Sequence, residues 1–306
     1  MRNAIKALVG TVPDESGNKK RIRIHQGWWR TFVLCEKEGL NPVDTNKNVC
    51  NTILNGEISK RNFLTQGIVK TVELVLKERT DKSKGKIETN RLYNNLLSSQ
   101  PLCFNFFGEL KQDLEFAKKV MASFYPDISE VTDIFFEFAP EENYTNDNSA
   151  FDVAIECIMN GKKSLIGFEC KYTDLFSDKE YDKNEYREIY HKSNCFKNSY
   201  SDYINKKYNQ LFRNQLIAEA LAQNSKYDQV LTGLFCYNED TSAIDIGNAF
   251  QEKLNNGVEV FKTITYKDFI IAIQKCKDIS WEQRKLSMLL WARYCGLELS
   301  DGIKES

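Results

Sequence analysis

Two carboxylates and one ammonium group belong to a stretch of sequence that has the pattern of a β-hairpin. The stretch FDVAIECIMNGKKSLIGFECKYTD, residues 151–174, holds two apolar runs around an Asn-Gly dipeptide, which is typical of a tight hairpin turn. Asp152 lies at the start of the first run, and Glu169 and Lys171 lie at the end of the second. A two-residue loop would place Asp152 opposite Glu169, whereas a four-residue loop would place it opposite Lys171.

Either register puts these three side chains on one face of the hairpin, because side chains alternate along a strand. Directly opposed side chains have Cβ atoms about 5 Å apart, and two carboxylates this close repel each other unless a cation sits between them. Oxygen ligands favour a hard ion, Mg²⁺ or Mn²⁺, so the pattern predicts a metal site. The alternative interpretation is a cross-strand ion pair between Lys171 and one carboxylate on a solvated face.

The elements around the hairpin predict a mixed α/β arrangement. Apolar residues at helical spacing predict a mainly helical N-terminal region over residues 1–92, in which 77–91 form a polar connection. The remainder alternates helices and strands and predicts a mixed sheet flanked by helices. The expected elements after residue 92 are a helix over 108–125 stopped by Pro126, strands within 131–140, 151–174 and 228–238, helices over 204–223 and 266–276, and a C-terminal segment in which Trp281 and Trp291 are expected in the core.

Composition excludes several classes of protein. Of the 306 residues, 42% are apolar and 28% are charged, and the formal net charge of −1 provides no global basic field. Nine cysteines without a C-x-x-C pair indicate reduced thiols in a cytoplasmic protein, not a disulfide framework or a zinc module. No apolar run reaches the roughly 18 residues of a membrane span, and no phosphate-loop or dinucleotide motif is present.

The order of Asp152, sixteen further residues and Glu169-Cys170-Lys171 resembles the motif of the PD-(D/E)XK nuclease superfamily, with Phe151 where the motif often has proline. Further blocks are similar to a bacterial family of restriction endonucleases with this fold: NFLTQGI, RLYNNLLSSQPLCFNFFGEL, AFDVAIEC, GFECKYTD, YREIYHKS and QLFRNQLIA. The resemblance implies a restriction-endonuclease-like core over 93–306. Its sheet would have four strands, and residues 1–92 would form an N-terminal helical extension.

The same resemblance implies roles for individual residues. Asp152 and Glu169 would bind Mg²⁺ or Mn²⁺, with the backbone carbonyl of Cys170 as a third ligand. Lys171 would activate the attacking water or neutralise the charge on the scissile phosphate. Glu109, which is expected in the first turn of the first core helix, would reach the metal site. The alternative for Glu109 is a favourable position of an acid at a helix N-terminus.

Further polar residues are candidates for supporting roles. Gln210, Arg213 and Asn214 share one face of a predicted helix because they lie at i, i+3 and i+4. In related nucleases a glutamine on this helix orients the site, which suits Gln210, and Arg213 suits a phosphate. All three are therefore candidates for nucleic-acid binding, and the alternative is a polar outer helix face. Glu137 and Glu156 are interpreted as rim positions, with a supporting role at the metal as the alternative.

Two stretches combine aromatic and charged residues. Residues 172–203 contain six tyrosines and favour either stacking on nucleic acid or a partly ordered surface excursion. In KKRIRIHQGWWR, residues 19–30, we expect Trp28 and Trp29 to anchor the N-terminal region, while contact of the cations with a nucleic-acid backbone is the alternative.

These features predict a Mg²⁺-dependent DNA endonuclease of restriction or defence. DNA is the expected partner, and a homodimer is the state that would cut both strands. A repair or processing nuclease with the same fold is one alternative, and an inactive nucleic-acid-binding module is another. The intact D…E-x-K pattern argues against the inactive module. The near-neutral charge favours binding at a specific site over general coating of DNA.

Overall fold

The computed structural model describes residues 8–302 except 43, 80–84, 174–175 and 178. The strands are β1 (Glu38–Leu40), β2 (Asn48–Ile53), β3 (Ile128–Phe138), β4 (Phe151–Met159), β5 (Lys162–Lys171), β6 (Gln229–Cys236) and β7 (Phe261–Thr265). The helices are α2 (Gly17–Trp28), α3 (Gly56–Ser59), α4 (Gln66–Glu78), α5 (Thr89–Asn94), α6 (Ser99–Gln112), α7 (Leu114–Met121), α8 (Asn184–Lys192), α9 (Asn209–Gln223), α10 (Thr241–Glu252), α11 (Gly257–Val260), α12 (Tyr266–Lys275) and α13 (Trp281–Tyr294).

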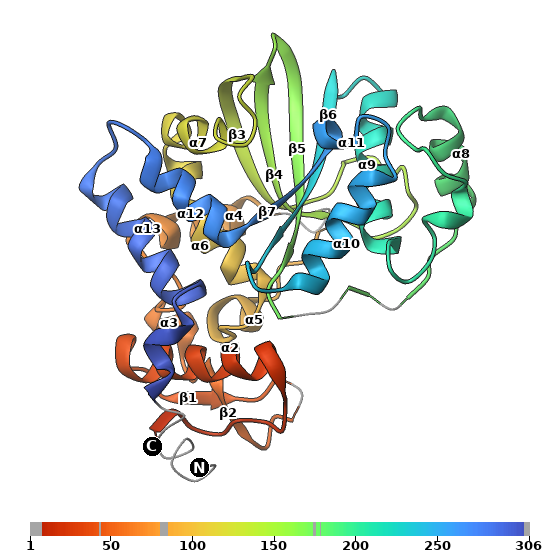
Figure 1. Cartoon of the computed structure of the whole chain (residues 1–306). Coiled ribbons are helices and arrows are strands. Elements are labelled where there is room, and N and C mark those ends of the chain that lie inside the picture. Colours follow the sequence, from red (N-terminus) through yellow and green to blue (C-terminus); the bar gives the residue numbers. More distant parts are fainter. Residues whose placement is uncertain (1–7, 43, 80–84, 174–175, 178, 303–306) are drawn as a thin grey trace.

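The central sheet has the strand order β3-β4-β5-β6-β7 (Figure 1). The first three strands are antiparallel, and β5, β6 and β7 are parallel. The parallel neighbours are joined through helices α8 and α9 and through α10 and α11, because parallel strands need a long crossover. The predicted mixed sheet flanked by helices is confirmed. It has five strands instead of four, since β7 adds a parallel edge strand.

The hairpin β4–β5 has the register of the two-residue loop. Met159 pairs with Lys162, and Val153 pairs with Phe168. Asn160 and Gly161 both have positive φ, 52° and 73°, as the type I′ turn of such hairpins requires. The register therefore places Asp152 beside Glu169 and excludes the four-residue loop.

Aromatic side chains fix the helix α6 against the centre of the sheet. Phe107 on α6 lies 5.3 Å from Phe235 on β6 and 6.2 Å from Phe168 on β5, measured between ring centroids. All three are almost fully buried, and each buried ring of this kind contributes about 1.5–3 kcal/mol through removal of apolar surface from water. Helix α6 therefore packs against β5, the strand that carries Glu169 and Lys171.

The predicted helix over 108–125 is two helices, α6 and α7. The break falls at Asp113, whose side chain accepts a hydrogen bond from the backbone N–H of Phe116 (2.9 Å) and so caps α7. An aspartate in this position favours a new helix start over continued helix. As α6 begins at Ser99, Glu109 lies in its last turn, and the expectation of a first-turn position is wrong.

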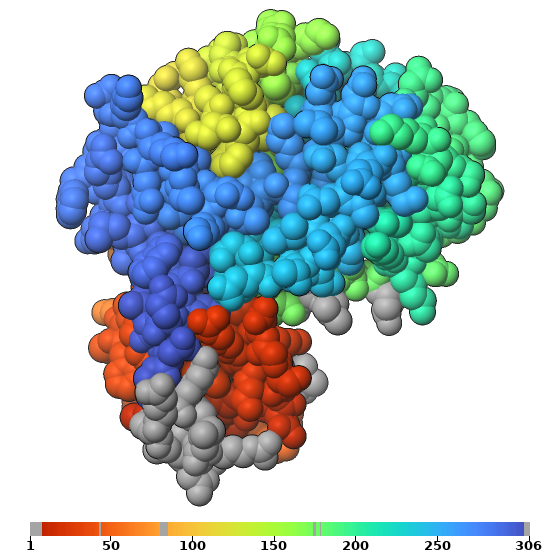
Figure 2. All heavy atoms as spheres, in the orientation of Figure 1, coloured from red at the N-terminus to blue at the C-terminus, as the bar shows by residue number. Residues whose placement is uncertain are grey.

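The N-terminal region is not purely helical, because β1 and β2 form a two-stranded antiparallel sheet. The division between residues 92 and 93 stays a prediction. Helix α5 extends across it, and one core cluster includes Val72 of α4 together with Val153 of β4. Figure 2 shows the N-terminal segment in red beside the C-terminal segment in blue. There the two imidazole nitrogens of buried His25 contact the Ala292 carbonyl (2.9 Å) and the Ser300 hydroxyl (3.0 Å).

The aromatic residues of several stretches differ from expectation. Tyr186 and Tyr203 are fully buried in a second core on the α8–α9 side of the sheet, so neither nucleic-acid stacking nor a loose excursion describes them. Trp29 is buried, as the anchoring interpretation predicts. Trp281 and Trp291 are exposed at 66% and 38%, so their placement in the core is wrong. None of the described helices is long and apolar enough to cross a membrane.

Candidate active site

Three carboxylates lie in a row across adjacent strands. Glu137 is on β3, Asp152 on β4 and Glu169 on β5. The registers of the two strand pairs, continued by one step, place Asp152 between Glu137 and Glu169. Their side chains share a cavity of about 340 Å³, which is lined by Lys86, Glu88, Arg91, Ser99, Gln100, Glu137, Asp152, Glu169, Cys170, Lys171 and Gln210.

Helix α9 and strand β5 together hold the Glu169 carboxylate. Its Oε1 accepts from Gln210 Nε2 (2.5 Å), and its Oε2 accepts from Asn214 Nδ2 (2.9 Å). The Lys171 ammonium lies 3.1 Å from Glu169 Oε1 and donates to Gln210 Oε1 (2.9 Å). Gln210 therefore contacts both Glu169 and Lys171, and Asn214, one helical turn later on α9, contacts Glu169. These two amides orient the charged side chains at the end of β5.

Lys171 and Glu169 are buried, each with a side chain only 8% exposed. The alternative of an ion pair on a solvated face is therefore wrong. The ammonium lies 5.0 Å from the centroid of the Phe176 ring. A buried ion pair costs several kcal/mol of desolvation per ion before its attraction is counted. Such a pair is therefore weak evidence for stability.

Asp152 is held by the backbone of the neighbouring strand. Its Oδ2 accepts a hydrogen bond from the Cys170 N–H (2.6 Å). Burial, together with the negative charges of Glu169 and Glu137, raises the pKa of Asp152 well above its usual value.

Glu137 joins the site, although its sequence suggested a rim position. Its backbone has φ of 51°, an uncommon left-handed conformation for a residue within a strand. A Cβ at Gly85 would come within 2.1 Å of the Glu137 carbonyl, so only glycine allows this close approach. Glu137 Oε1 accepts from Gln100 Nε2 (3.0 Å). Burial and the charge of Glu169 raise the pKa of Glu137 to about 7, against the effect of the Gln100 hydrogen bond.

The charges of the site fit a divalent cation. The carboxylates of Glu137, Asp152 and Glu169 line the cavity together with the half-exposed Glu88, and the Lys171 ammonium contacts Glu169. Within the described ranges, no three His, Cys, Asp or Glu side chains are grouped as ligands of one ion. Carboxylate oxygens are ligands of hard divalent cations, so one or two of these carboxylates could hold such an ion, with water or phosphate in the remaining positions. Cys170 lines the cavity, and ligation through its carbonyl stays a prediction.

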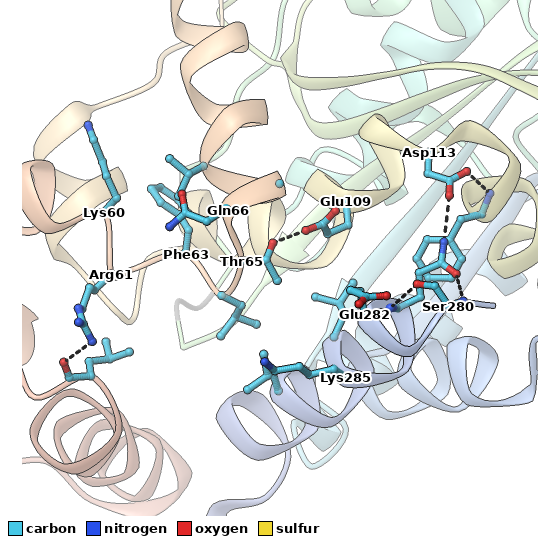
Figure 3. A pocket seen from close by; sticks show the side chains of 18 of the residues that line it. Lys60, Arg61, Phe63, Thr65, Gln66, Glu109, Asp113, Ser280, Glu282 and Lys285 are labelled. Atoms are coloured by element: carbon cyan, nitrogen blue, oxygen red, sulfur yellow. Dashed lines mark hydrogen bonds between the residues drawn. The ribbon is translucent and has the colours of Figure 1, made fainter.

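The structure does not bring Glu109 to this row of carboxylates. Its carboxylate accepts a hydrogen bond from the Thr65 hydroxyl at the N-terminus of α4. Figure 3 shows Glu109 beside Thr65 in another, larger cavity of about 910 Å³, with Asp113, Glu282 and Lys285 along its wall. The position of Glu109 in the last turn of α6 explains the difference. The larger cavity lacks the row of Glu137, Asp152 and Glu169 across adjacent strands.

Two other candidates lie outside the cavity. Arg213 pairs with Asp147 (3.6 Å), and its guanidinium lies 4.6 Å from the Tyr181 ring centroid, so it is engaged away from Glu169. Glu156 lies on β4, nearer the hairpin turn than Asp152, and accepts hydrogen bonds from Thr132 Oγ1 (3.0 Å) and the Tyr227 hydroxyl (3.0 Å). This is consistent with the expected rim position.

Comparisons with known proteins agree with the geometry. Residues 13–296 match the family model described as the PD-(D/E)XK nuclease superfamily. No curated protein matches the chain, and no solved structure matches it. The matched residues include the row of Glu137, Asp152 and Glu169, the strand of Lys171, and helix α9. They also include the N-terminal region from residue 13 onward, with β1, β2 and α5.

Proposed function

The chain belongs to the PD-(D/E)XK nuclease superfamily, and from this premise we propose that it is a Mg²⁺-dependent DNA endonuclease. One observation carries the proposal: Lys171 is buried in contact with Glu169, and both face the same cavity as Asp152 and Glu137. Hydrolysis of a phosphodiester needs a polarised phosphorus–oxygen bond, an activated water and positive charge near the pentavalent transition state.

The residues of the chain divide this work. Asp152 and Glu169 would hold the ion, and Glu137 would accept hydrogen bonds from its waters. The Lys171 ammonium would donate to the attacking water or to a non-bridging phosphate oxygen with the donor that Glu169 and Gln210 leave unused. Gln210 and Asn214 keep Glu169 oriented. A bound Mg²⁺ supplies a Lewis acid and lowers the pKa of its water.

We also propose a restriction or defence role, in which the N-terminal portion that the family match includes would serve as the recognition region. A cytoplasmic location would suit that role. Two copies would act together to cut both strands, because one cavity holds one set of acids. A repair nuclease would use the same chemistry on a different DNA structure.

Cleavage assays test the activity directly. Purified protein should cut plasmid and phage DNA with Mg²⁺ or Mn²⁺ and leave it intact with EDTA. Asp152→Asn, which keeps the size of the side chain, should be inactive with either metal. Uncut DNA in all conditions, with folded wild-type protein at high concentration, would contradict the proposal. Cleavage of RNA alone would replace DNA as the substrate.

Metal binding should also stabilise the folded protein. At a Mg²⁺ concentration one hundred times its Kd, we expect about 2.7 kcal/mol of additional unfolding free energy, because the ion binds only the folded site. Thermal unfolding with and without Mg²⁺ measures this gain. Asp152→Asn should lose it, while Glu109→Gln, in the other cavity, should keep it. An equal gain in both variants would place the ion elsewhere.

A further inference from the structure

A second polar cavity, of about 590 Å³, adjoins the candidate active site. Arg91 lines both cavities. Ser98 lines the second cavity and its neighbour Ser99 the first, and Thr173 lines the second while Lys171, two residues earlier, lines the first. The two cavities are therefore adjoining parts of one cleft. The second part is built largely from the N-terminal region.

Helix α2 forms a wall of the second cavity and is fastened to the catalytic strand. Lys19 and Arg23 line the cavity one helical turn apart, and Gln26 follows on the same face. Gln26 Nε2 donates to the hydroxyl of buried Tyr172 (2.8 Å), the residue that directly follows Lys171. This hydrogen bond fixes the cation-bearing face of α2 relative to the end of β5.

A chain of hydrogen bonds orders the polar side chains of the second cavity. Arg23 Nε donates to Glu15 (2.6 Å), and another guanidinium nitrogen of Arg23 donates to Asn51 Oδ1. Asn51 Nδ2 donates to Asn95 Oδ1 (3.1 Å), which also accepts from the Leu97 N–H (3.0 Å). The Asn95 oxygen thus uses both of its acceptor positions.

The Asn95 amide nitrogen has a different position. It donates no hydrogen bond to any residue that the structure describes, and Asn95 lines the cavity. The fixed oxygen determines the orientation of the amide group, so its two N–H donors are held ready for an acceptor. Glu15 neutralises Arg23 through two hydrogen bonds, while its Oε1 lies 3.9 Å from the Lys19 ammonium. Arg91 and the more loosely paired Lys19 are therefore the cations for a ligand.

These groups match the chemistry of a nucleotide. Amide side chains pair with the edges of bases, and lysine and arginine bind phosphates. The volume lies within the range of about 300–1,000 Å³ found for small-ligand pockets. We propose that this cavity is a nucleotide subsite, which takes one nucleotide of DNA next to the scissile phosphate. Asn95 donates to its base, and Lys19 and Arg91 bind its phosphates. The inference rests on the proposed nuclease function.

Asn95→Asp tests the base contact. Aspartate keeps the oxygen that Asn51 and Leu97 need and replaces the N–H donors by a second acceptor. We expect the affinity of the metal-free protein for a short DNA duplex, measured by fluorescence anisotropy, to fall about tenfold, which corresponds to about 1.4 kcal/mol. Asn48→Asp is the matched control, because it adds the same charge at the exposed start of β2 outside the cavity. It should change the affinity by less than about twofold.

Lys19→Ala tests the phosphate contact with little risk to folding, since the Lys19 side chain is 48% exposed. One lost phosphate contact should reduce the slope of log affinity against log salt concentration by about 0.9. Lys47→Ala is the control, because Lys47 is also paired with a nearby acid but lies outside the cavity. Its salt slope should equal that of the wild type.

Sequencing of the cut ends separates the subsite from the nuclease proposal. If Asn95→Asp still cuts DNA but shows a flatter base preference beside the cut, both proposals are supported. If it binds and cuts with the wild-type affinity and preference, the subsite is overturned while the nuclease stands. If the wild type binds DNA without cutting it and Asn95→Asp weakens that binding, the subsite stands and the nuclease falls. A wild type that does not bind DNA overturns the subsite.

Discussion

Replacement of Lys171 by methionine should lower the rate of DNA cleavage by roughly 10²–10³-fold, while the protein still folds and binds DNA. The magnitude is that of losing one preorganised donor to a developing oxyanion. The ammonium is already fixed by Glu169 Oε1 at 3.1 Å and Gln210 Oε1 at 2.9 Å, so it needs no reorganisation when the phosphate arrives. Methionine keeps most of the side-chain volume beside Phe176 and removes only the charge.

Stability and catalysis must be separated in this experiment, because Lys171 is buried. Breaking a buried ion pair from one side costs about 3–5 kcal/mol of stability. The rate should therefore be measured well below the melting temperature and expressed per folded molecule. Lys86→Ala is the matched control, since Lys86 lines the same cavity but is 80% exposed and paired with Glu88. We expect its rate to stay within a few-fold of the wild type.

Two outcomes would contradict the role of Lys171. Wild-type cleavage by folded Lys171→Met would show that the ammonium only balances the charge of Glu169. Full activity of Lys171→Arg would show that general positive charge is enough, because the planar guanidinium cannot occupy the compact position between Glu169 and Gln210.

The sequence was sufficient for the part of the site that depends on local pattern. The Asn-Gly turn sets the hairpin register, and the register brings Asp152 to Glu169, so both could be placed from strand alternation. Helical spacing likewise placed Gln210 and Asn214 on one face of α9, where both contact Glu169. These relations extend over one hairpin or one turn of helix, and local sequence determines them.

The rest depends on contacts that local pattern does not encode. Glu137 reaches the site because β3 pairs with β4 in one particular register and because Gly85, from a distant connection, accommodates its left-handed backbone. Its place in a predicted strand, between apolar neighbours, was the available signal. Glu109 was misplaced because a capping aspartate, Asp113, divides one apolar stripe into two helices. Arg213 lies on the same face of α9 as Gln210, but its guanidinium pairs with Asp147.

The N-terminal region illustrates the same limit. Its basic aromatic stretch could be assigned to anchoring or to DNA contact; the structure confirms anchoring for Trp29, and contact with DNA stays a prediction. Trp29 is buried in the core, whereas Lys19 and Arg23 line the cavity beside the active site. The hydrogen bond between Gln26 and Tyr172 links residues 146 positions apart, a pairing that no local periodicity predicts.

The metal-free protein should become less stable as the pH rises from 6.5 to 8.5. In the unfolded chain, aspartate and glutamate lose their protons near pH 4, so neither Asp152 nor Glu137 holds one in this range. In the folded chain, burial and mutual repulsion raise the pKa of Asp152 well above its usual value and that of Glu137 to about 7. The folded state therefore binds more protons than the unfolded state, and its stability falls with rising pH as long as it keeps them.

The slope should be about 1.4 kcal/mol per pH unit for each proton that only the folded state holds. Asp152 contributes to this slope wherever its raised pKa keeps it protonated in the folded state, and Glu137 adds to the loss near pH 7. Urea unfolding at a series of pH values, in the presence of EDTA, measures the slope. Burial lowers the pKa of His25 from 6.5 to about 4. Below pH 6.5 the unfolded chain therefore binds a proton on this residue that the folded chain does not, which lowers the stability of the folded protein. The measured range stays above pH 6.5 for this reason.

Two comparisons connect this slope to the proposed metal site. Asp152→Asn should flatten it, because asparagine has no proton to lose. Saturating Mg²⁺ should flatten it in the wild type, because a bound cation favours the ionised carboxylates throughout the range. A slope that is equal in wild type, Asp152→Asn and Mg²⁺-saturated protein would mean that the row of Glu137, Asp152 and Glu169 neither shares protons nor exchanges them for a metal. The three acids would then lack the coupling that a hydrolytic metal site requires.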